Sequence, residues 1–284
     1  MIGRVLVVCW ALLLSAQATA VRLADDSGQT LELARPPQRI VALAPHLTEL
    51  LFAVGAGAQL VGVDSTSDYP PAARALPRVG DAHRVNFERL VALRPDLVVV
   101  WLDGQRAADL QRLRSLGVRV LYTRAARLDD VARLLRMLGE ASGHAAAGEG
   151  AARQFTAGLA ALKRTRRVAL PVFYQVWDRP LMTVGGRHWI SEALALCGAR
   201  NVFADLDAAA PVVSREAVLR RAPALVIGGS DGPDPRRDWQ RHARLPAVQH
   251  GAFARVNADR LHRPTPRLLD GIAELCAVVD AYAR

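Results

Sequence analysis

The sequence has no apolar stretch of about eighteen or more residues, the length that a membrane-spanning helix needs. An unbroken apolar run covers residues 5–14. One early charge, Arg4, precedes this run, and Ala18, Thr19 and Ala20 follow it. A charge, a short apolar run and small residues in this order are typical of a cleaved secretory signal. We therefore expect residues 1–20 to be removed and the mature chain to be a soluble periplasmic protein.

Lysine is almost absent, and so are the patterns of nucleic-acid and metal sites. All but one of the 37 basic residues are arginine, scattered beside Asp and Glu. They form no basic block interleaved with aromatic residues, so a generally basic surface explains the net charge of +10 better than a nucleic-acid partner. His46 and Glu49 lie three positions apart, but no third residue completes a metal site.

Cysteine is also scarce, with three residues in the whole chain. Cys9 lies inside the expected signal without the small residue that precedes a lipid-attached cysteine, so a lipoprotein is the lesser alternative. Cys197 and Cys276 lie on apolar helical patterns. An even pair in an oxidising compartment usually forms a disulfide. We expect this bond to link two helices, the alternative being two buried free thiols.

The remaining chain contains two copies of one unit. Residues 88–100 can be laid over residues 216–228, with Glu88 on Glu216 and proline and apolar positions in register. In each copy a capping residue starts a short helix, the proline ends it and a buried parallel strand follows. The copies lie too far apart for a solenoid, whose period is about 20–50 residues, so they predict two similar lobes.

Strands and helices alternate in both halves. Residues 39–44 and 168–174 are expected strands, each followed by a helix that stops at Gly55 or Gly198. Glu49 precedes Gly55 by the same spacing that separates Glu192 from Gly198. The alternation predicts an α/β fold of two lobes with mainly parallel sheets and a ligand in the cleft between them.

The connector between the halves is rich in alanine and free of proline. Phe155, Leu159 and Leu162 lie on one side of it, as in a single long helix. The predicted division is a signal at 1–20, an N-terminal lobe at 21–144, a connecting helix at 145–166 and a C-terminal lobe at 167–284. Lobes joined by a helix should hinge little.

Several segments resemble the helical-backbone class of periplasmic binding proteins, and nearest to them is its cobalamin-binding branch. The matching segments are residues 39–45, 48–49, 67–71, 86–89, 95–101 and 214–216. The resemblance spans nearly the whole mature chain. It implies a monomer without cofactor or enzymatic activity that captures cobalamin or a related corrinoid. An ABC importer would receive the ligand at its permease dimer in the inner membrane; haem and ferric siderophores are the alternative ligands.

The resemblance also implies that Glu88 and Glu216 dock onto arginines of the two transporter subunits. The duplication supports this role independently, because a receptor on a two-fold symmetric importer needs equivalent charges at matched positions. The alternative is that each carboxylate only complements the positive end of its own helix, an effect of about 0.3–1 kcal/mol.

A corrinoid presents a broad apolar ring with amide arms, so its site needs aromatic plates and a few polar partners. Tyr69 and Trp101 match cobalamin-contacting positions of the family, and Trp177 is expected to face the cleft. The alternatives are a turn residue for Tyr69 and ordinary packing for the two tryptophans.

The chain departs from the resemblance where two expected tryptophans are replaced by Ala82 and Ala210. His83 could close the pocket by contacting a cobalt-bound group or a propionate, or be a solvated loop residue. Arg263 and Arg267 could meet carboxylates on a ligand rim, as in the haem and siderophore branches, or serve the structure alone.

A hydrolase is the rival from another class. Residues 228–232 fit the G-x-S-x-G pattern after a buried strand, but Pro233 and Pro235 prevent the helix that a nucleophile elbow needs. We therefore keep a serine hydrolase only as a remote alternative.

Overall fold

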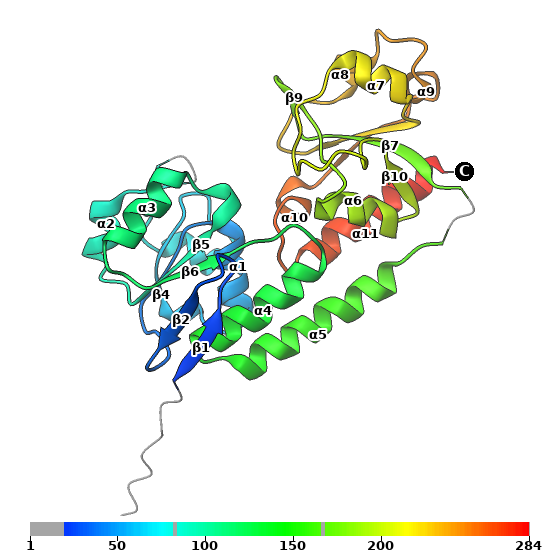
Figure 1. Cartoon of the computed structure of the whole chain (residues 1–284). Coiled ribbons are helices and arrows are strands. Elements are labelled where there is room, and N and C mark those ends of the chain that lie inside the picture. The colour runs from blue at the N-terminus through cyan, green and yellow to red at the C-terminus, as the bar shows by residue number, and fades with distance from the viewer. Residues whose placement is uncertain (1–19, 82–83, 166–167, 284) are drawn as a thin grey trace, which may run out of the picture.

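The computed structural model describes residues 20–81, 84–165 and 168–283, which form two α/β lobes beside a pair of long helices (Figure 1). The expected signal lies outside the described residues except for Ala20. Within these ranges no helix has the length and apolar character that crossing a membrane requires.

Each lobe is built on a parallel sheet of four strands, and the two sheets share one strand order. In both, the second strand along the chain lies at the edge, followed by the first, third and fourth. The N-terminal sheet runs β4 (Leu60–Val63), β3 (Ile40–Ala42), β5 (Leu97–Trp101) and β6 (Val120–Thr123). The C-terminal sheet runs β10 (Ala199–Asn201), β7 (Leu170–Gln175), β11 (Leu225–Gly229) and β12 (Phe253–Val256). The shared order confirms the duplicated unit.

The helices of the two lobes correspond as well. The matched pairs are α1 (Pro45–Ala53) with α6 (Trp189–Leu196), α2 (Phe87–Ala92) with α7 (Arg215–Arg221), and α4 (Asp129–Ser142) with α11 (Leu268–Tyr282). Asn86 and Ser214 cap α2 and α7 by accepting backbone N–H bonds, as the sequence predicts. The two lobes differ before their last strand. The N-terminal lobe has one helix there, α3 (Ala107–Ser115), whereas the C-terminal lobe has two short helices, α8 (Arg236–Trp239) and α9 (Pro246–Gln249).

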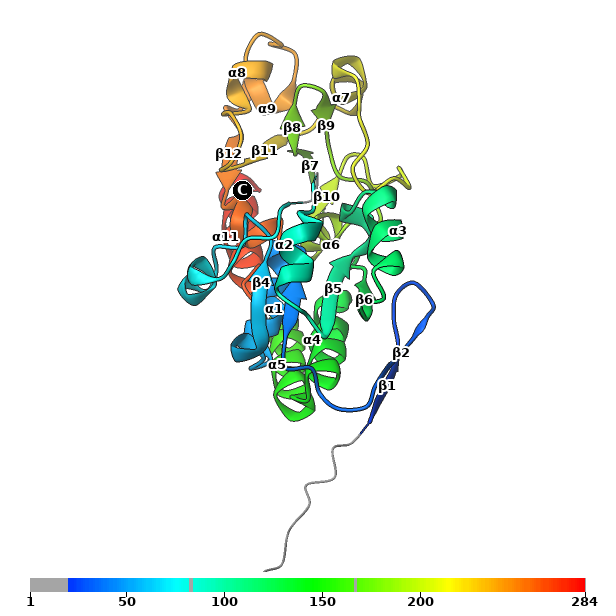
Figure 2. The ribbon, with the colours of Figure 1, turned by 90° about the vertical axis from the view of Figure 1, so that its left-hand side faces the viewer.

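The smaller elements complete the lobes. They are the hairpins β1 (Val21–Ala24) with β2 (Thr30–Leu33) and β8 (Trp177–Asp178) with β9 (Leu181–Met182), the 3-10 turns η1 (Gly57–Gln59), η2 (Pro71–Ala75) and η3 (Leu102–Gly104), and the short helix α10 (Ala258–Leu261). Figure 2 shows α2 and α3 on one side of the N-terminal lobe, away from α4 and α5.

The connector is the helix α5 (Ala145–Leu162), which packs along α4. Phe155 and Leu159 are buried on its inner side. Gly148 has a packing role here, because a Cβ at this position would come within 2.6 Å of the Leu135 carbonyl oxygen of α4. The glycine therefore allows the two backbones to approach closely.

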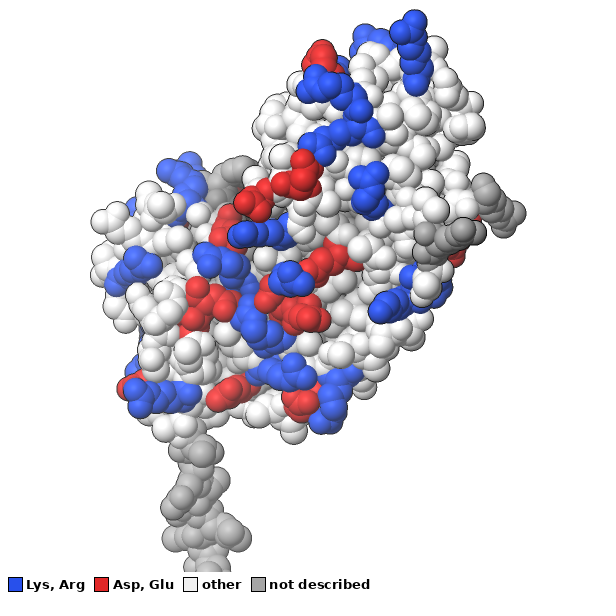
Figure 3. Space-filling view, turned by 45° about the vertical axis from the view of Figure 1, so that its right-hand side comes forward, with Lys and Arg blue, Asp and Glu red and all other residues white. Residues whose placement is uncertain are grey.

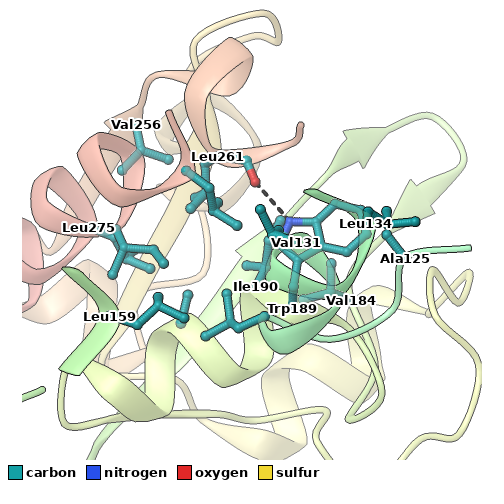
Figure 4. Packing of buried hydrophobic residues seen from close by; sticks show 14 of the residues in the cluster. Ala125, Val131, Leu134, Leu159, Val184, Trp189, Ile190, Val256, Leu261 and Leu275 are labelled. Carbon is teal, nitrogen blue, oxygen red and sulfur yellow. Dashed lines mark hydrogen bonds between the residues drawn. The ribbon is translucent and has the colours of Figure 1, made fainter. Parts of the chain in front are cut away.

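The larger of two apolar core clusters extends across both lobes. Val131 and Leu134 of α4 belong to the same buried cluster as Trp189 and Ile190 of α6 (Figure 4). The Trp189 indole N–H donates to the Leu261 carbonyl at 2.9 Å. A continuous core opposes separation of the lobes, because opening would expose apolar surface to water.

A disulfide joins Cys197 at the end of α6 to Cys276 in α11, with Cα atoms 4.7 Å apart. It confirms the pairing expected from the sequence. Both helices flank the C-terminal sheet, and they also contact each other directly. The bond therefore stabilises this lobe internally and does not tie the two lobes together.

Candidate ligand-binding cleft

The predicted aromatic contacts follow the carboxyl ends of parallel strands, where α/β sheets hold their ligands. Trp101 ends β5, Tyr69 lies after β4, and Trp177 lies after β7. The outline of the molecule is indented where the two lobes meet (Figure 3). These three aromatic side chains therefore come from strand ends of both lobes.

Trp101 is partly buried, and its ring meets the His46 ring edge-on at 5.2 Å between centroids. Gly104 makes this position of the indole possible, because a Cβ there would lie 2.0 Å from the tryptophan ring. Trp101 Nε1 and His46 Nε2 are buried without a hydrogen-bond partner among the described residues. Burial, followed by the charge of Arg263, lowers the pKa of His46 to about 3, so the imidazole is neutral at physiological pH.

Tyr69 is 42% exposed and connects the lobes. The guanidinium of Arg267, from the C-terminal lobe, lies 3.8 Å from the centre of its ring, a cation–π contact. The two residues line a hollow of about 310 Å³ together with Glu49 and Pro266. Tyr69 is therefore held at the junction and is not a loose turn residue.

Trp177 is half exposed on the β8–β9 hairpin, which projects from the C-terminal lobe on the side of the N-terminal lobe (Figure 1). Its indole N–H donates to the Arg179 carbonyl at 3.0 Å. Met182 pairs with Trp177 and also bridges to Val212, which is 64% exposed. Two exposed apolar residues thus flank Met182 from opposite sides, and Val212 lies two positions after Ala210, where an aromatic residue was expected. Val212 was missed in the sequence because nothing distinguishes it from a core valine.

Arg263 already has carboxylate partners within the protein. Its Nη1 donates to Glu49 Oε1 at 3.0 Å and to Asp68 Oδ1 at 2.6 Å, and its Nη2 lies 2.9 Å from Asp259 Oδ1. Burial opposes the charge, but the bonds to Asp68 and Glu49 outweigh it and raise the pKa of Arg263. Arg267 also binds Glu49, at 2.6 and 2.9 Å. The two arginines therefore join the lobes, a role that the sequence did not indicate.

The docking candidates Glu88 and Glu216 are exposed in the first turns of α2 and α7. These helices lie at the outer ends of their lobes, far from α5 (Figure 1). Bonds from its own backbone N–H and from the Ser214 side chain lower the pKa of Glu216. Val91, three positions after Glu88, is 48% exposed, and Leu219 holds the matching place in α7.

Ser230, the serine of the G-x-S-x-G pattern, has no hydrogen bond to a histidine among the described residues. Its Oγ accepts the Ala258 N–H at 3.0 Å, and no helix follows before α8. His262 bonds the Tyr174 hydroxyl at 2.8 Å and lies 3.6 Å from Asp231. The contacts of Ser230 and His262 thus lack the nucleophile–base pair of a serine hydrolase.

Two positions of interest, Ala82 and His83, lie outside the described residues, so the prediction for His83 stays untested. Among the residues that are described, no three His, Cys, Asp or Glu side chains cluster as metal ligands would.

Comparisons with known proteins agree on one family. A family model described as "Periplasmic binding protein" matches residues 40–259. The chain is 36% identical over 252 residues to a vitamin B12-binding protein of Vibrio parahaemolyticus, covering 88% of this chain and 92% of the relative. It is 38% identical over 256 residues to a vitamin B12-binding protein of Pectobacterium carotovorum, covering 87% and 90%.

Solved structures show the same fold. The periplasmic vitamin B12 binding protein BtuF of Vibrio cholerae matches with a TM-score of 0.79 and 35% identity, over 88% of this chain and 99% of that one. The periplasmic heme-binding protein RhuT from Roseiflexus sp. RS-1 matches with a TM-score of 0.77 and 25% identity, over 87% and 99%.

Proposed function

The chain belongs to the periplasmic binding protein family, and from this membership we propose that it captures cobalamin or a related corrinoid and delivers it to an ABC importer. The observation that carries the proposal is the aromatic surface at the strand ends of both lobes, Tyr69, Trp101 and Trp177, in a chain that is 35–38% identical to proteins named for vitamin B12. Exposed aromatic faces offer apolar contact to a broad ring.

The charges at the junction favour a corrinoid over haem. Haem carries two propionate carboxylates, whereas the side arms of the cobalamin ring are neutral amides. The positive charges of Arg263 and Arg267 are already balanced by Glu49, Asp68 and Asp259. A propionate would have to compete with these carboxylates, of which Glu49 is buried, and an amide would not.

Arg263 can still contact the ligand as a hydrogen-bond donor. Hydrogen bonds to Glu49 and Asp68 occupy two of the five N–H donors of the guanidinium, and Asp259 is an ion-pair partner of Nη2. A further N–H can donate to an amide carbonyl of the ring edge without breaking an ion pair. We propose this role for Arg263 in place of the carboxylate contact expected from the sequence, and His83 remains a proposed contact.

We propose that the outer ends of the two lobes form the transporter-docking surface. Glu88 and Glu216 are exposed at matching places of equivalent helices, each followed by an apolar side chain three positions later. Such matched charges complement a two-fold symmetric permease dimer and orient the encounter. Residues 1–20 would direct the chain to the periplasm, where it acts as a monomer.

Calorimetry and visible spectroscopy with cyanocobalamin and haemin, side by side, test the ligand. We expect tight binding of cyanocobalamin, weakened about thirtyfold by Trp177→Ala, which removes about 2 kcal/mol of apolar contact. Val168→Ala is the matched control. Val168 is 79% exposed, but it precedes the first residue of β7, whereas Trp177 follows the last residue of this strand. Haemin binding without cyanocobalamin binding would make this a haem-binding protein.

A further inference from the structure

We propose that Glu49 and Glu192 are equivalent positioning residues that set the width of the cleft. Glu49 of α1, in the N-terminal lobe, contacts the start of α11 in the C-terminal lobe. Glu192 of α6, in the C-terminal lobe, contacts the start of α4 in the N-terminal lobe. Together they form two reciprocal contacts across the junction, one on each side.

The two glutamates hold the same place in the duplicated fold. Glu49 lies in α1, directly after β3, and Glu192 lies in α6, the equivalent helix after β7. Each is followed at the same spacing by a glycine with positive φ, Gly55 at 86° and Gly198 at 76°. The same turn of the same helix therefore carries a carboxylate in each lobe.

Glu49 reaches the start of α11 in the C-terminal lobe. The Glu49 side chain is only 2% exposed, and both of its carboxylate oxygens accept hydrogen bonds from Arg267, which occupies the N-cap position of α11. Arg263 adds a third bond at 3.0 Å. These arginines are held in the C-terminal lobe, since Arg263 pairs with Asp259 of α10.

Glu192 makes the reciprocal contact at the start of α4 in the N-terminal lobe. Its Oε2 accepts the backbone N–H of Leu128, the capping residue of α4, at 2.8 Å. Its Oε1 lies 2.8 Å from Nη2 of Arg127. Asp130 accepts the Arg127 N–H at 2.9 Å and keeps this segment in place.

The N-terminal lobe holds the same segment through its own ion pairs. Arg133 of α4 bonds Asp26, at 2.7 Å, beyond the first strand of the lobe. Figure 3 shows acidic and basic side chains crowded where the lobes meet. The reach of Glu192 to Leu128 therefore crosses between the lobes and is not a contact within one of them.

The two contacts together resemble an isologous interface. In such an interface, a residue of one half contacts a second residue of the other half, and the equivalent pair makes the same contact in the opposite direction. A single contact would leave the lobes free to rock about it. Two contacts at separate places also resist rotation. Apolar packing at the junction is non-directional, whereas these bonds depend on distance and angle, so they select one opening of the cleft.

The two contacts are unequal in charge. Glu49 is bonded to two arginines, whereas Glu192 has one arginine and one backbone amide. Loss of Glu49 leaves two partly buried cations without their shared carboxylate, so we expect the larger effect at this position.

The distance between the lobes tests the inference directly. Spin labels on cysteines in place of the exposed Arg89 and Arg220 report the separation of α2 and α7 by double electron–electron resonance. We expect Glu49→Ala with Glu192→Ala to widen the distance distribution at least twofold, and each single variant to widen it less. A double variant with the parental distribution would overturn the inference.

Glu274→Ala is the matched control, because Glu274 also accepts a backbone N–H, that of Asn257 at 3.1 Å, but within one lobe. The distance distribution of the Glu274→Ala variant should equal that of the parent protein. Circular dichroism establishes that each variant is folded; if Glu49→Ala is not, Glu49→Gln keeps the side-chain size and removes the charge.

The consequence for binding rests on the proposed function. We expect the double variant to bind cyanocobalamin at least tenfold more weakly, because the walls of the cleft are no longer held at one separation. A parent that does not bind cyanocobalamin would overturn the proposed ligand, while the distance measurement would still decide the role of the two glutamates.

Discussion

At the scale of single residues, burial of two histidines has consequences for acid stability. His46 and His188 lie near the starts of α1 and α6, and desolvation lowers the pKa of each to about 3. In the unfolded chain each takes up a proton near pH 6.5. Between pH 6.5 and 3 the unfolded chain therefore binds more protons, and the free energy of unfolding falls as the pH falls through this window.

We predict that His46→Gln makes the protein less sensitive to acid. Each such histidine contributes up to about 1.4 kcal/mol per pH unit to the slope of the free energy of unfolding, so the variant should lose about that much slope between pH 6 and 4. Urea unfolding across this range measures it. The exposed His250→Gln is the control, and an unchanged slope in His46→Gln would show that His46 is protonated in the folded protein.

At the scale of elements, the helical pair α4 and α5 depends on close backbone contact. Alanine has the higher helix propensity, so a glycine in the middle of a helix normally costs about 1 kcal/mol. At Gly148 the facing carbonyl of Leu135 leaves no room for a Cβ. Steric packing between the helices therefore outweighs propensity at this position.

We predict opposite effects from the same substitution at two glycines of α5. Gly148→Ala should lower the free energy of unfolding by about 1–3 kcal/mol, because the two helices must move apart. Gly150→Ala should raise it by about 0.5–1 kcal/mol, since nothing lies within 4 Å of a Cβ there. Thermal unfolding compares the two, and equal stabilisation by both would contradict the close approach of α4 and α5.

At the scale of the whole molecule, duplication places one acidic side chain at each outer end. α2 and α7 each begin at a residue whose side chain caps the helix, carry a glutamate at the same position and are followed by the equivalent strand. The junction between the lobes, with its continuous core and its reciprocal glutamates, holds these two ends at one separation. In the docking that we propose, a rigid molecule of this form would present both charges to the permease dimer at once.

We predict that Glu88→Lys with Glu216→Lys abolishes ligand uptake in cells while leaving the affinity for cyanocobalamin unchanged. Like charges would then face the arginines expected on the transporter, which slows productive encounter. Transport assays and calorimetry measure the two effects. Glu140→Lys, at an exposed position of α4, should leave transport intact. Loss of ligand affinity in the double variant would assign the glutamates to the binding site.

The elements and their repetition can be predicted from the amino-acid sequence alone. Strands, caps and helix ends follow from local apolar patterns and from residues such as Asn86, Ser214 and Gly198, whose effects reach only a few positions along the chain. Cys197 and Cys276 could be paired because no other cysteine remains after the signal. The likeness of residues 88–100 to residues 216–228 predicted two lobes in the same way.

Which charged groups meet depends on how the chain packs in three dimensions. Arg263 and Glu49 are 214 positions apart, and nothing local distinguishes an arginine that binds a ligand from one that joins two lobes. Val212 is exposed where its segment bridges to Met182 of the β8–β9 hairpin, although its side chain suits a core equally well. Long-range ion pairs and exposure depend on the packing of whole lobes, which local pattern does not encode.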